Sequence, residues 1–445
     1  MAGVISRGIR GPIIREGDDI VDIVVNSVYA SEQADGYTLQ DRDVIAVTES
    51  VVARAQGNYV TVDQVAQDIR NKFPAKKLGL VFPILSRNRF SMCLKGIARA
   101  MDEVVILFSY PNDEVGNPLM VRSAYLKNRY SGVYDFQEAD FVKTFGSPVH
   151  PFTGVNYLDF YREVIESEGA KATFLFSNDC RYIASFCDQV LCCDIHTRNE
   201  TRDVLQAMGK TVFTLADVMS APVNGSGYHD KYGMLGSNKA TEEKLKLFPR
   251  NCQPVVDSIQ ARIAKERGLH VEVMVYGDGA FKDPVGGIWE LADPVVSPAY
   301  TAGLAGKPNE LKLKFLADND FADLSGEALQ EAIRQEIKAK NADLVGDMSS
   351  EGTTPRQYTD LLGSLCDLTS GSGDKGTPFA GLPNLRGRAP LRANSPAAFG
   401  RGVHIWGLIC SCACGRWKSA ALFWRGVVFV IFDKINCFFS RFLVS

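Results

Sequence analysis

Short apolar runs that predict buried β-strands alternate with segments of helical periodicity along residues 1–378 of this chain. This alternation is typical of helices and strands packed in layers around a shared core, so we predict an α+β fold with mixed α/β layers. The predicted strands span residues 43–48, 79–82, 104–108, 172–176 and 271–275. Residues 111–153 are rich in Pro, Gly, Asn and Tyr and predict an irregular insertion or a flap.

Three segments predict helices. The first spans residues 49–55 and directly follows a predicted strand. The second begins at Pro254, a residue type favoured at the first helical position, and runs to about Arg267. The third has Ser325 as its expected N-cap and runs to about Lys340. Apolar residues at every fourth position of the two longer helices are expected in the core: Val255, Ile259, Ile263, Leu329, Ile333 and Ile337.

Charge is distributed unevenly along the 445 residues, whose formal net charge is −3. Residues 379–445 contain nine Lys and Arg and one acid, whereas residues 1–378 contain 40 bases and 51 acids. The body is therefore about −11, which disfavours nucleic acid as a partner because phosphate binding needs clustered bases. The body has no CxxC pair, Cys192 and Cys193 are interpreted as buried thiols, and the chain starts without the apolar run of a secretory signal. We therefore expect a cytoplasmic location.

These contrasts divide the chain into three parts. We expect an N-terminal part of the body at residues 1–223, a C-terminal part with metal or phosphate loops at 224–378, and an atypical tail at 379–445. The uncharged runs of the tail are too short for a membrane-spanning helix. The tail has three interpretations: a shifted reading frame or misjoined gene end, a basic aromatic anchor on a membrane surface, or a partner-binding domain. The first leaves the fold without its final strand and exposes a sheet edge.

The strongest local signal of a site follows the last predicted strand. Gly277 and Gly279 flank Asp278 where that strand ends, and ligands of open α/β sheets collect at the carboxyl ends of strands. Glycines let a phosphate or a metal approach the backbone, and a carboxylate oxygen suits Mg²⁺ or Mn²⁺. The alternative is a tight turn with a solvated aspartate.

Two glycine-rich loops are further candidates for phosphate binding. Residues 371–377, which include Lys375, have the composition of a phosphate loop without its usual spacing, so a flexible loop is the alternative. The backbone amides of residues 224–238 can bind an anion, and an amide side chain there can bind a metal or substrate. The candidate residues of this second loop are Gly236, Ser237 and Asn238.

Four basic or titratable side chains complete the candidates. Arg87 and Arg89 follow a predicted strand and can clamp carboxylates or phosphates, although a solvated basic turn is equally compatible with them. His229 is expected to be a surface loop residue. His196, close to Asp194, suits either anion recognition or a structural role.

Three blocks of this sequence are similar, in order and spacing, to the sequences of a known family. Residues 14–19 with 41–57 form the first, residues 247–278 the second and residues 358–371 the third. Together they resemble the coenzyme F420-0:L-glutamate ligase family, especially its longer bacterial members, over residues of about 5–378.

The resemblance implies a two-part α+β architecture, usually homodimeric, and a reaction that forms an amide. A nucleoside triphosphate, GTP in the archaeal enzymes and GTP or ATP here, phosphorylates an acceptor carboxylate, and the amine of L-glutamate displaces the phosphate. Mg²⁺ or Mn²⁺ neutralises the polyphosphate. The acceptor stays open between F420-0, a folate and another small carboxylate. The alternative function is a catalytically silent relative that binds a nucleotide or a similar ligand.

The same resemblance assigns residues. Asp278 matches a metal-binding aspartate, and Asn238 and Asp360 are further candidate metal ligands. Two acids of the family pattern are replaced by Leu235 and Leu361, which motivates the alternative of a silent relative. The candidates for the phosphate side are Arg54, Arg87, Gly236, Ser237, Asn238, Gly277, Gly279 and Lys375.

Overall fold

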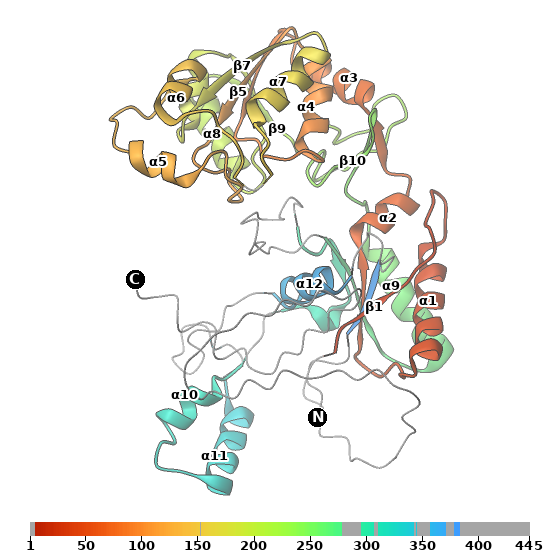
Figure 1. Cartoon of the computed structure of the whole chain (residues 1–445). Helices are drawn as coiled ribbons and strands as arrows, with labels where there is room; N and C mark the ends of the chain where they lie inside the picture. The colour runs from red at the N-terminus through yellow and green to blue at the C-terminus, as the bar shows by residue number, and fades with distance from the viewer. Residues whose placement is uncertain are drawn as a thin grey trace, which may run out of the picture. The chain divides into compact units, whose positions relative to one another are not determined.

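The computed structural model describes residues 5–151, 153–277, 295–306, 310–341, 344, 357–370 and 378–382 (Figure 1). Residues Ser6–Pro383 form one compact unit. Within the described part of this unit, the strands form three sheets, of five, six and three strands. Helices flank these sheets, which confirms the predicted α+β class.

The five-stranded sheet joins the two ends of the described chain. Its order is β1-β14-β2-β12-β13, and β2 pairs in parallel with β12. The strands are β1 (Arg7–Ile9), β2 (Val44–Thr48), β12 (Glu272–Tyr276), β13 (Ala299–Tyr300) and β14 (Phe379–Leu382). β14 lies between β1 and β2, where Phe379 and Ala380 are buried. The missing final strand that follows from a shifted reading frame after residue 378 is therefore contradicted, because residues 379–382 form a strand of the sheet, and the other bounds of the three parts stay predictions.

Helices cover both faces of this sheet because side chains alternate along each strand. One set of alternate residues packs with α1 (Ile20–Asp35) and α9 (Gln253–Arg267), and the other packs with α12 (Tyr358–Thr369). The first set is Ile45, Val47, Val273 and Val275, and the second is Val44, Ala46, Met274 and Tyr276. α9 confirms the helix predicted from Pro254, and it ends at Gly268, whose φ of 67° is a left-handed conformation that favours glycine.

The six-stranded sheet is formed by one continuous stretch of the chain. Its order is β6-β7-β5-β4-β8-β9, and the strands from β7 to β9 are parallel. The strands are β4 (Lys77–Val81), β5 (Glu103–Phe108), β6 (Phe136–Gln137), β7 (Lys171–Phe176), β8 (Gln189–Cys192) and β9 (Thr211–Thr214). The direction of strand succession reverses between β4 and β8, which is the arrangement of a doubly wound sheet. The sequence predicts β4, β5 and β7, but not this order.

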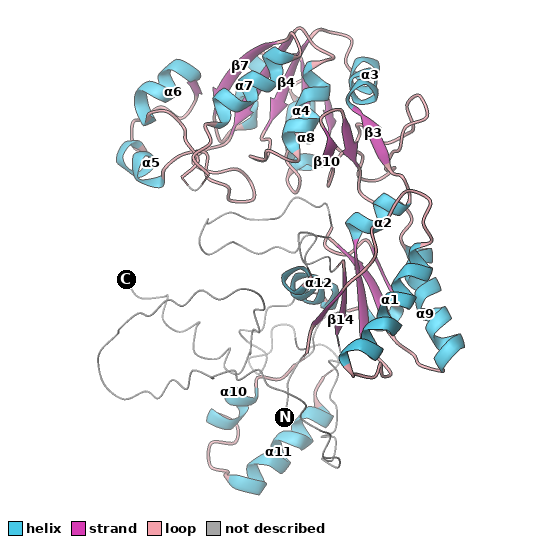
Figure 2. Cartoon of the chain, turned by 45° about the vertical axis from the view of Figure 1, so that its right-hand side comes forward, coloured by secondary structure: helices cyan, strands magenta, loops and turns pink. Residues whose placement is uncertain are grey.

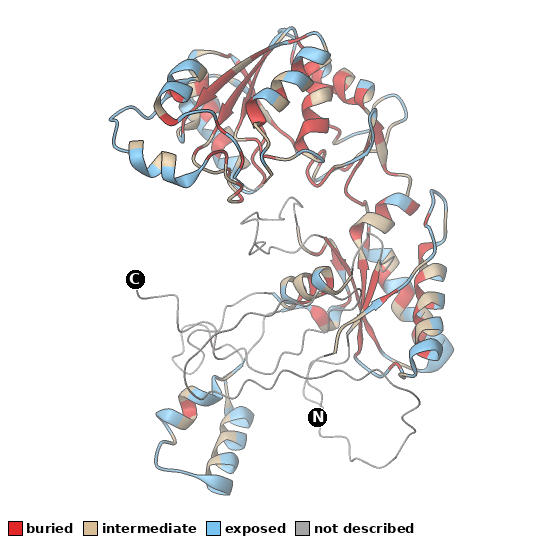
Figure 3. Ribbon diagram, in the orientation of Figure 1, coloured by how far each residue is buried: buried red, intermediate tan, exposed pale blue. Residues whose placement is uncertain are grey.

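Two layers of helices cover the six-stranded sheet (Figure 2). α4 (Phe90–Ala98) and α7 (Tyr157–Ser167) pack on one face, and α8 (Arg198–Ala207) packs on the other with the 3-10 helix η1 (Cys180–Ser185). Figure 3 shows that the strands of this sheet are buried along most of their length. Cys192 and Cys193 are buried in this region, as predicted.

The three-stranded sheet is antiparallel, in the order β10-β11-β3. Its strands are β3 (Tyr59–Thr61), β10 (Asn238–Thr241) and β11 (Lys244–Lys246). In this sheet, β3 from the predicted N-terminal part pairs with β11 from the predicted C-terminal part. The division of the body between residues 223 and 224 stays a prediction. Two helices adjoin β3: α2 (Glu49–Ala55), which has the predicted bounds, and α3 (Val62–Lys72), which begins with a capping box of Thr61 and Gln64.

Two regions depart from the predictions. Residues 111–153 contain α5 (Arg122–Asn128) and α6 (Glu138–Phe145), which contradicts an irregular insertion, while the alternative of a flap stays a prediction. α11 (Gly326–Ala339) confirms the third predicted helix, but its cap residue Ser325 makes no side-chain capping bond.

The core role predicted for the apolar stripe of α11 is also wrong. None of the residues of α11 is buried, and Ile337 is 43% exposed. The helix packs beside the short helix α10 (Leu313–Asp318), which cannot cover the stripe as a sheet does. A 3-10 turn at Ala302–Leu304 completes the described elements. Within the described residues, no helix is both long and apolar enough to cross a membrane.

Candidate active site

A cavity of about 1120 Å³ lies where β2 and β12 end. Thr48 and Tyr276, which pair in register as the last residues of these parallel strands, both line it. Further lining residues come from the start of α2, the loop before α4, the β10–β11 hairpin and the last turn of α12. Ligands of α/β folds collect at the carboxyl ends of parallel strands, so this cavity is the candidate active site.

Basic side chains dominate the charge of this cavity. The described residues that line it include the bases Arg15, Arg54, Arg89, Lys239, Lys244 and Lys246 and the acids Glu16, Glu49 and Asp367. An excess of bases in a concave site produces a positive potential that attracts anions. Guanidinium groups also bind phosphates and carboxylates through two parallel hydrogen bonds. The lining therefore suits a polyanionic ligand.

Glu49 and Lys246 are deeply buried charges of the lining. Lys246 Nζ donates to both carboxylate oxygens of Glu49, at 3.0 and 3.1 Å, and their side chains are 9% and 6% exposed. Glu49 begins α2 and Lys246 ends β11, so the pair connects the helix that follows β2 to the three-stranded sheet. A charge shielded from water is costly unless it is paired, so each side chain holds the other in place.

Two tyrosines add aromatic surface to the lining. Tyr276 is buried, its hydroxyl shares a hydrogen bond with Ser370 Oγ, and burial raises its pKa far above the ordinary value, so the phenol is neutral. Lys244 Nζ lies over the ring of Tyr59, 4.4 Å from its centroid. This cation–π contact orients the ammonium group at the wall of the cavity.

The residues predicted to bind phosphates do not all line the same cavity. Arg54 and Asn238 line the cavity, and so does Arg89. Gly236 and Ser237 line a small adjoining cavity instead, where Ser237 Oγ lies 3.4 Å from the sulfur of Cys93. The structure thus brings the side chain of Asn238 to the large cavity without the two residues that precede it.

Other predicted residues lie outside this lining. Arg87 is exposed, and its charge, after the larger effect of burial, lowers the pKa of His150. Asp360 lies in the first turn of α12, whereas the last turn of that helix faces the cavity. The N–H of Gly277 donates to the carbonyl of Val296 at 2.7 Å and so serves the fold. Asp278, Gly279 and Lys375 lie outside the described residues.

The two leucines that replace family acids have different surroundings. Leu235 is 1% exposed within the core beside the six-stranded sheet, so a carboxylate there would be buried among apolar side chains. Leu361 is 38% exposed on α12. The surface position expected for His229 is wrong, because its ring packs 4.8 Å from that of Tyr232 and burial lowers its pKa. His196 is exposed.

Sequence reasoning missed several charged residues of the cavity. Glu49 had a signal, because it directly follows a predicted strand and ligands collect at that end of strands. Its partner Lys246 is 197 residues away along the chain and has no distinctive local motif. Arg15 and Asp367 fall within the blocks that carry the family resemblance, but nothing in their spacing indicated a shared cavity.

The implied divalent metal can be tested against the described donors. Glu16, Asp367 and Asn238 supply oxygen atoms of the kind that Mg²⁺ and Mn²⁺ prefer. In the described ranges, however, no group of three or more His, Cys, Asp or Glu side chains is arranged to hold a metal ion. These residues alone do not fit the metal, and the chemistry that they support rests on their own charges.

Comparison with known proteins agrees with the sequence resemblance. Residues 8–384 match the family model described as F420-0:Gamma-glutamyl ligase. The matched range begins in β1 and includes β14, so it contains all the described strands of the three sheets except the first residue of β1. No curated protein matches the chain. The family match extends over most of the 445 residues, and the chain therefore belongs to the F420-0:gamma-glutamyl ligase family.

Proposed function

We propose that the protein is a ligase that joins L-glutamate to the carboxylate of a small acceptor and consumes GTP or ATP. The observation that carries this proposal is the cavity with six described basic side chains at the carboxyl ends of β2 and β12, in a chain of this ligase family. The nucleotide, the acceptor carboxylate and glutamate are all anions, so each is attracted by the positive potential of the cavity.

In the proposed reaction, an oxygen of the acceptor carboxylate attacks the γ-phosphorus and the nucleoside diphosphate leaves. The ammonium group of glutamate first loses one proton to water, and the neutral nitrogen then attacks the acyl carbon. Phosphate leaves with the electron pair of the C–O bond, and the nitrogen loses a second proton to water to give the amide. Positioned cations stabilise the charge on the transferring phosphoryl group. We assign this role to Arg15, Arg54 and Lys244, which line the cavity.

The acids of the cavity suit the other substrate. Glu16 and Asp367 line it together with Arg15 and Arg54. A carboxylate attracts the ammonium group of an amino acid, while an arginine binds its carboxylates through paired hydrogen bonds. The mixture of signs on this side therefore supports an amino acid, such as L-glutamate, as one of the substrates.

The remaining parts of the proposal come from the resemblance. They are a need for Mg²⁺ or Mn²⁺, with Asp278, Asn238 and Asp360 as ligands, and F420-0, a folate or a similar acid as the acceptor. A homodimer in the cytoplasm is part of the same proposal.

A silent nucleotide-binding relative is the second candidate. It is favoured by the leucines at positions 235 and 361, where the family pattern has acids.

One experiment separates the two candidates. The purified full-length chain is incubated with GTP or ATP, Mn²⁺, L-glutamate and either F420-0 or a folate, and the products are identified by mass spectrometry. The ligase predicts an acceptor heavier by one glutamyl residue, formed only with nucleotide, and Arg54→Met raises the KM of the nucleotide by about tenfold or more, as expected for a charged hydrogen bond. Arg334→Met is the matched control, since Arg334 forms an exposed ion pair on α11. Tight nucleotide binding without any amide product supports the silent relative and contradicts the ligase.

A further inference from the structure

The β10–β11 hairpin carries much of the positive charge of the cavity. Lys239, Lys244 and Lys246 all belong to it, and they are half of the six described bases of the lining. The position of this hairpin therefore determines where half of the basic side chains lie relative to an anionic ligand in the cavity.

The backbone alone holds the outer strand of the hairpin weakly. β10 is at the edge of the three-stranded sheet, and its register with β11 shifts between Lys239 and Thr241. Lys239, Ala240 and Thr241 are exposed. Edge strands with few ladder bonds and little buried surface open at low free-energy cost. Contacts from outside the sheet are needed to fix such a strand.

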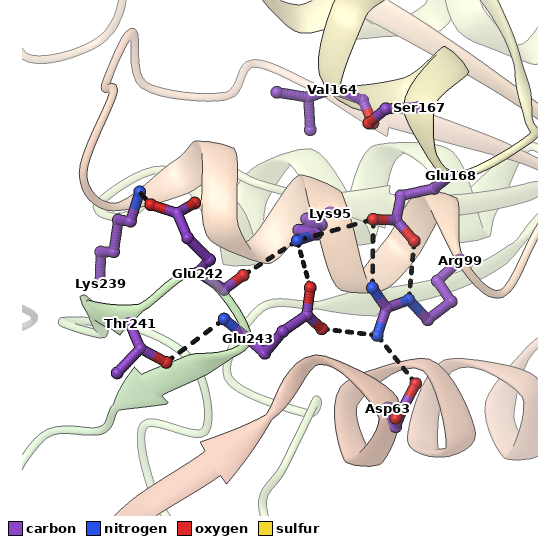
Figure 4. A network of polar contacts seen from close by, with 10 residues as sticks. All are labelled: Asp63, Lys95, Arg99, Val164, Ser167, Glu168, Lys239, Thr241, Glu242 and Glu243. Carbon is purple, nitrogen blue, oxygen red and sulfur yellow. Dashed lines mark hydrogen bonds and ion pairs between the residues drawn. The ribbon is translucent and has the colours of Figure 1, made fainter.

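Lys95 of α4 and Arg99, the C-cap residue that directly follows this helix, supply these contacts at the turn of the hairpin (Figure 4). Lys95 Nζ donates to the backbone carbonyl of Glu242 at 2.9 Å and to the carboxylate of Glu243 at 2.5 Å. Arg99 Nη1 donates to the other oxygen of Glu243 at 2.8 Å. Lys95 and Arg99 are four residues apart, so they lie on the same side of the helix. Lys95 and Arg99 thus bind the turn through the backbone carbonyl of Glu242 and both carboxylate oxygens of Glu243.

Further ion pairs fix the side chain of Arg99 itself, beside the six-stranded sheet. Arg99 Nε and Nη2 donate to the two oxygens of Glu168, at 2.7 and 3.1 Å, and Nη1 also reaches Asp63 at 2.8 Å. Glu168 follows α7 and is 12% exposed, so it is shielded more than the other acids of the cluster. A guanidinium held in two parallel bonds has a fixed plane, which fixes the direction of its remaining bonds.

A further ion pair links this turn to the cavity. Lys239, which lines the cavity, donates to the carboxylate of Glu242 at 2.5 Å. The hydrogen bonds of Arg99 and Lys95 lower the pKa of Glu243 to about 2, so this carboxylate is charged at neutral pH. The chain of contacts runs from Glu168 through Arg99 to the turn and on to a base of the cavity.

We propose that Arg99 and Lys95 are positioning residues of the ligase, which hold the β10–β11 hairpin so that its two lysines that are not buried, Lys239 and Lys244, stay at the wall of the cavity that receives the phosphates of the nucleotide. Neither residue lines the cavity, so each acts through the hairpin. The nucleotide as ligand rests on the proposed function, whereas the effect on the hairpin does not depend on it.

Hydrogen exchange and nucleotide binding in Arg99→Met test the proposal. Amide exchange of residues 238–246 is measured by mass spectrometry, and the Kd of GTP is measured by calorimetry with Mg²⁺ present. We expect faster exchange confined to the hairpin and a Kd raised about tenfold, since small displacements of binding groups cost this much or more. The KM of GTP rises by a similar factor while kcat changes less. Arg99→Lys keeps the charge but cannot form the two parallel hydrogen bonds of the guanidinium group, so its affinity for GTP lies between those of Arg99→Met and the wild type.

Two controls make the outcome decisive. Lys210→Met removes an ion pair with Asp188 in the same region, away from the hairpin, and leaves exchange and Kd unchanged. Glu243→Gln removes the charge at the exposed end of the cluster, and it replaces Arg99→Met in the test if that variant does not fold. The same faster exchange and raised Kd are expected of it. Unchanged exchange of the hairpin, or an unchanged Kd despite faster exchange, overturns the proposal. If the wild-type chain binds neither GTP nor ATP, the proposed function fails, and the exchange measurement alone decides whether Arg99 holds the hairpin.

Discussion

The five-stranded and six-stranded sheets contribute to the candidate site in different ways. The side of the five-stranded sheet supplies two strand ends and all three described acids of the lining. The loop between β4 of the six-stranded sheet and α4 supplies Arg89, and the charged side chains that the β10–β11 hairpin supplies are all bases. The cavity therefore has a wall of mixed charge and a wall that is purely positive. An amino acid suits the first, and a polyphosphate suits the second.

The two sheets also differ in how the chain forms them. Residues 77–214 build the six-stranded sheet without interruption, whereas the five-stranded sheet needs strands from both ends of the described chain. The blocks of sequence that resemble the ligase family fall in and around the five-stranded sheet: residues 14–19, 41–57, 247–278 and 358–371. The family resemblance thus rests on sequence near the mixed wall. Of the bases on the positive wall, the sequence indicated Arg89, whereas the three lysines of the hairpin are recognised only from the structure.

Removing the charge that joins the two walls is the most severe test of this comparison. Lys246→Met removes the ammonium group that neutralises the buried carboxylate of Glu49, which costs about 3–5 kcal/mol of the free energy of unfolding. Urea denaturation measures the loss. The double variant Lys246→Met with Glu49→Leu recovers most of it, because two apolar side chains replace the pair. A single variant as stable as the wild type would show that the pair does not hold the walls together.

A second test concerns the strand that completes the five-stranded sheet. Phe379 is fully buried in β14, and Phe379→Ala should cost about 3 kcal/mol because it leaves a cavity. Phe174→Ala in β7 is the matched change in the six-stranded sheet, where the ring is 1% exposed. Thermal unfolding of both variants, with fluorescence and amide exchange as probes, shows which sheet loosens. If Phe379→Ala has no effect, β14 does not close the sheet.

The smallest expected effect is a difference in pH dependence. Asp113, 7% exposed beside the six-stranded sheet, has a pKa raised to about 7 because burial disfavours its charge. The folded state then binds more protons than the unfolded state from pH of about 4 to about 7, so the contribution of Asp113 to stability falls as the pH rises through this range. The slope is up to about 1.4 kcal/mol per pH unit, and Asp113→Asn removes it.

The measurement is urea denaturation at several pH values between 5 and 8. Asp188→Asn serves as the control, because Asp188 is exposed and its ion pair with Lys210 lowers its pKa. The difference in slope between the wild type and Asp113→Asn is the quantity that matters. Parallel slopes for these two proteins would contradict the assignment.

Local patterns predicted local structure well. The helix at residues 49–55 has the predicted bounds, because a strand end and a glycine delimit it. α9 and α11 carry the same apolar spacing, yet Ile259 is buried and Ile337 is 43% exposed. Spacing shows that a helix has an apolar stripe, but it does not show which surface covers the stripe.

The candidate site was predicted only in part for the same reason. Arg54 reaches the cavity from the last turn of a helix whose bounds the sequence predicts, and Asn238 reaches it from the end of the predicted glycine-rich loop, although the strand that begins there was not predicted. Glu49 and Lys246 form a pair across 197 residues, and only the order of the strands brings them together. The aspartate expected at position 235 is a leucine that belongs to the core, which a motif alone does not reveal.

The position of β14 has a consequence for the order of events during synthesis. β1 and β2 are made early, but the strand that pairs with both of them is made only after residue 378. The six-stranded sheet is finished by residue 214, so it can fold on the ribosome while β1 and β2 still have unpaired edges. A nascent chain stopped before residue 379 would therefore contain one finished sheet and one open sheet, with edges available to chaperones or to other chains.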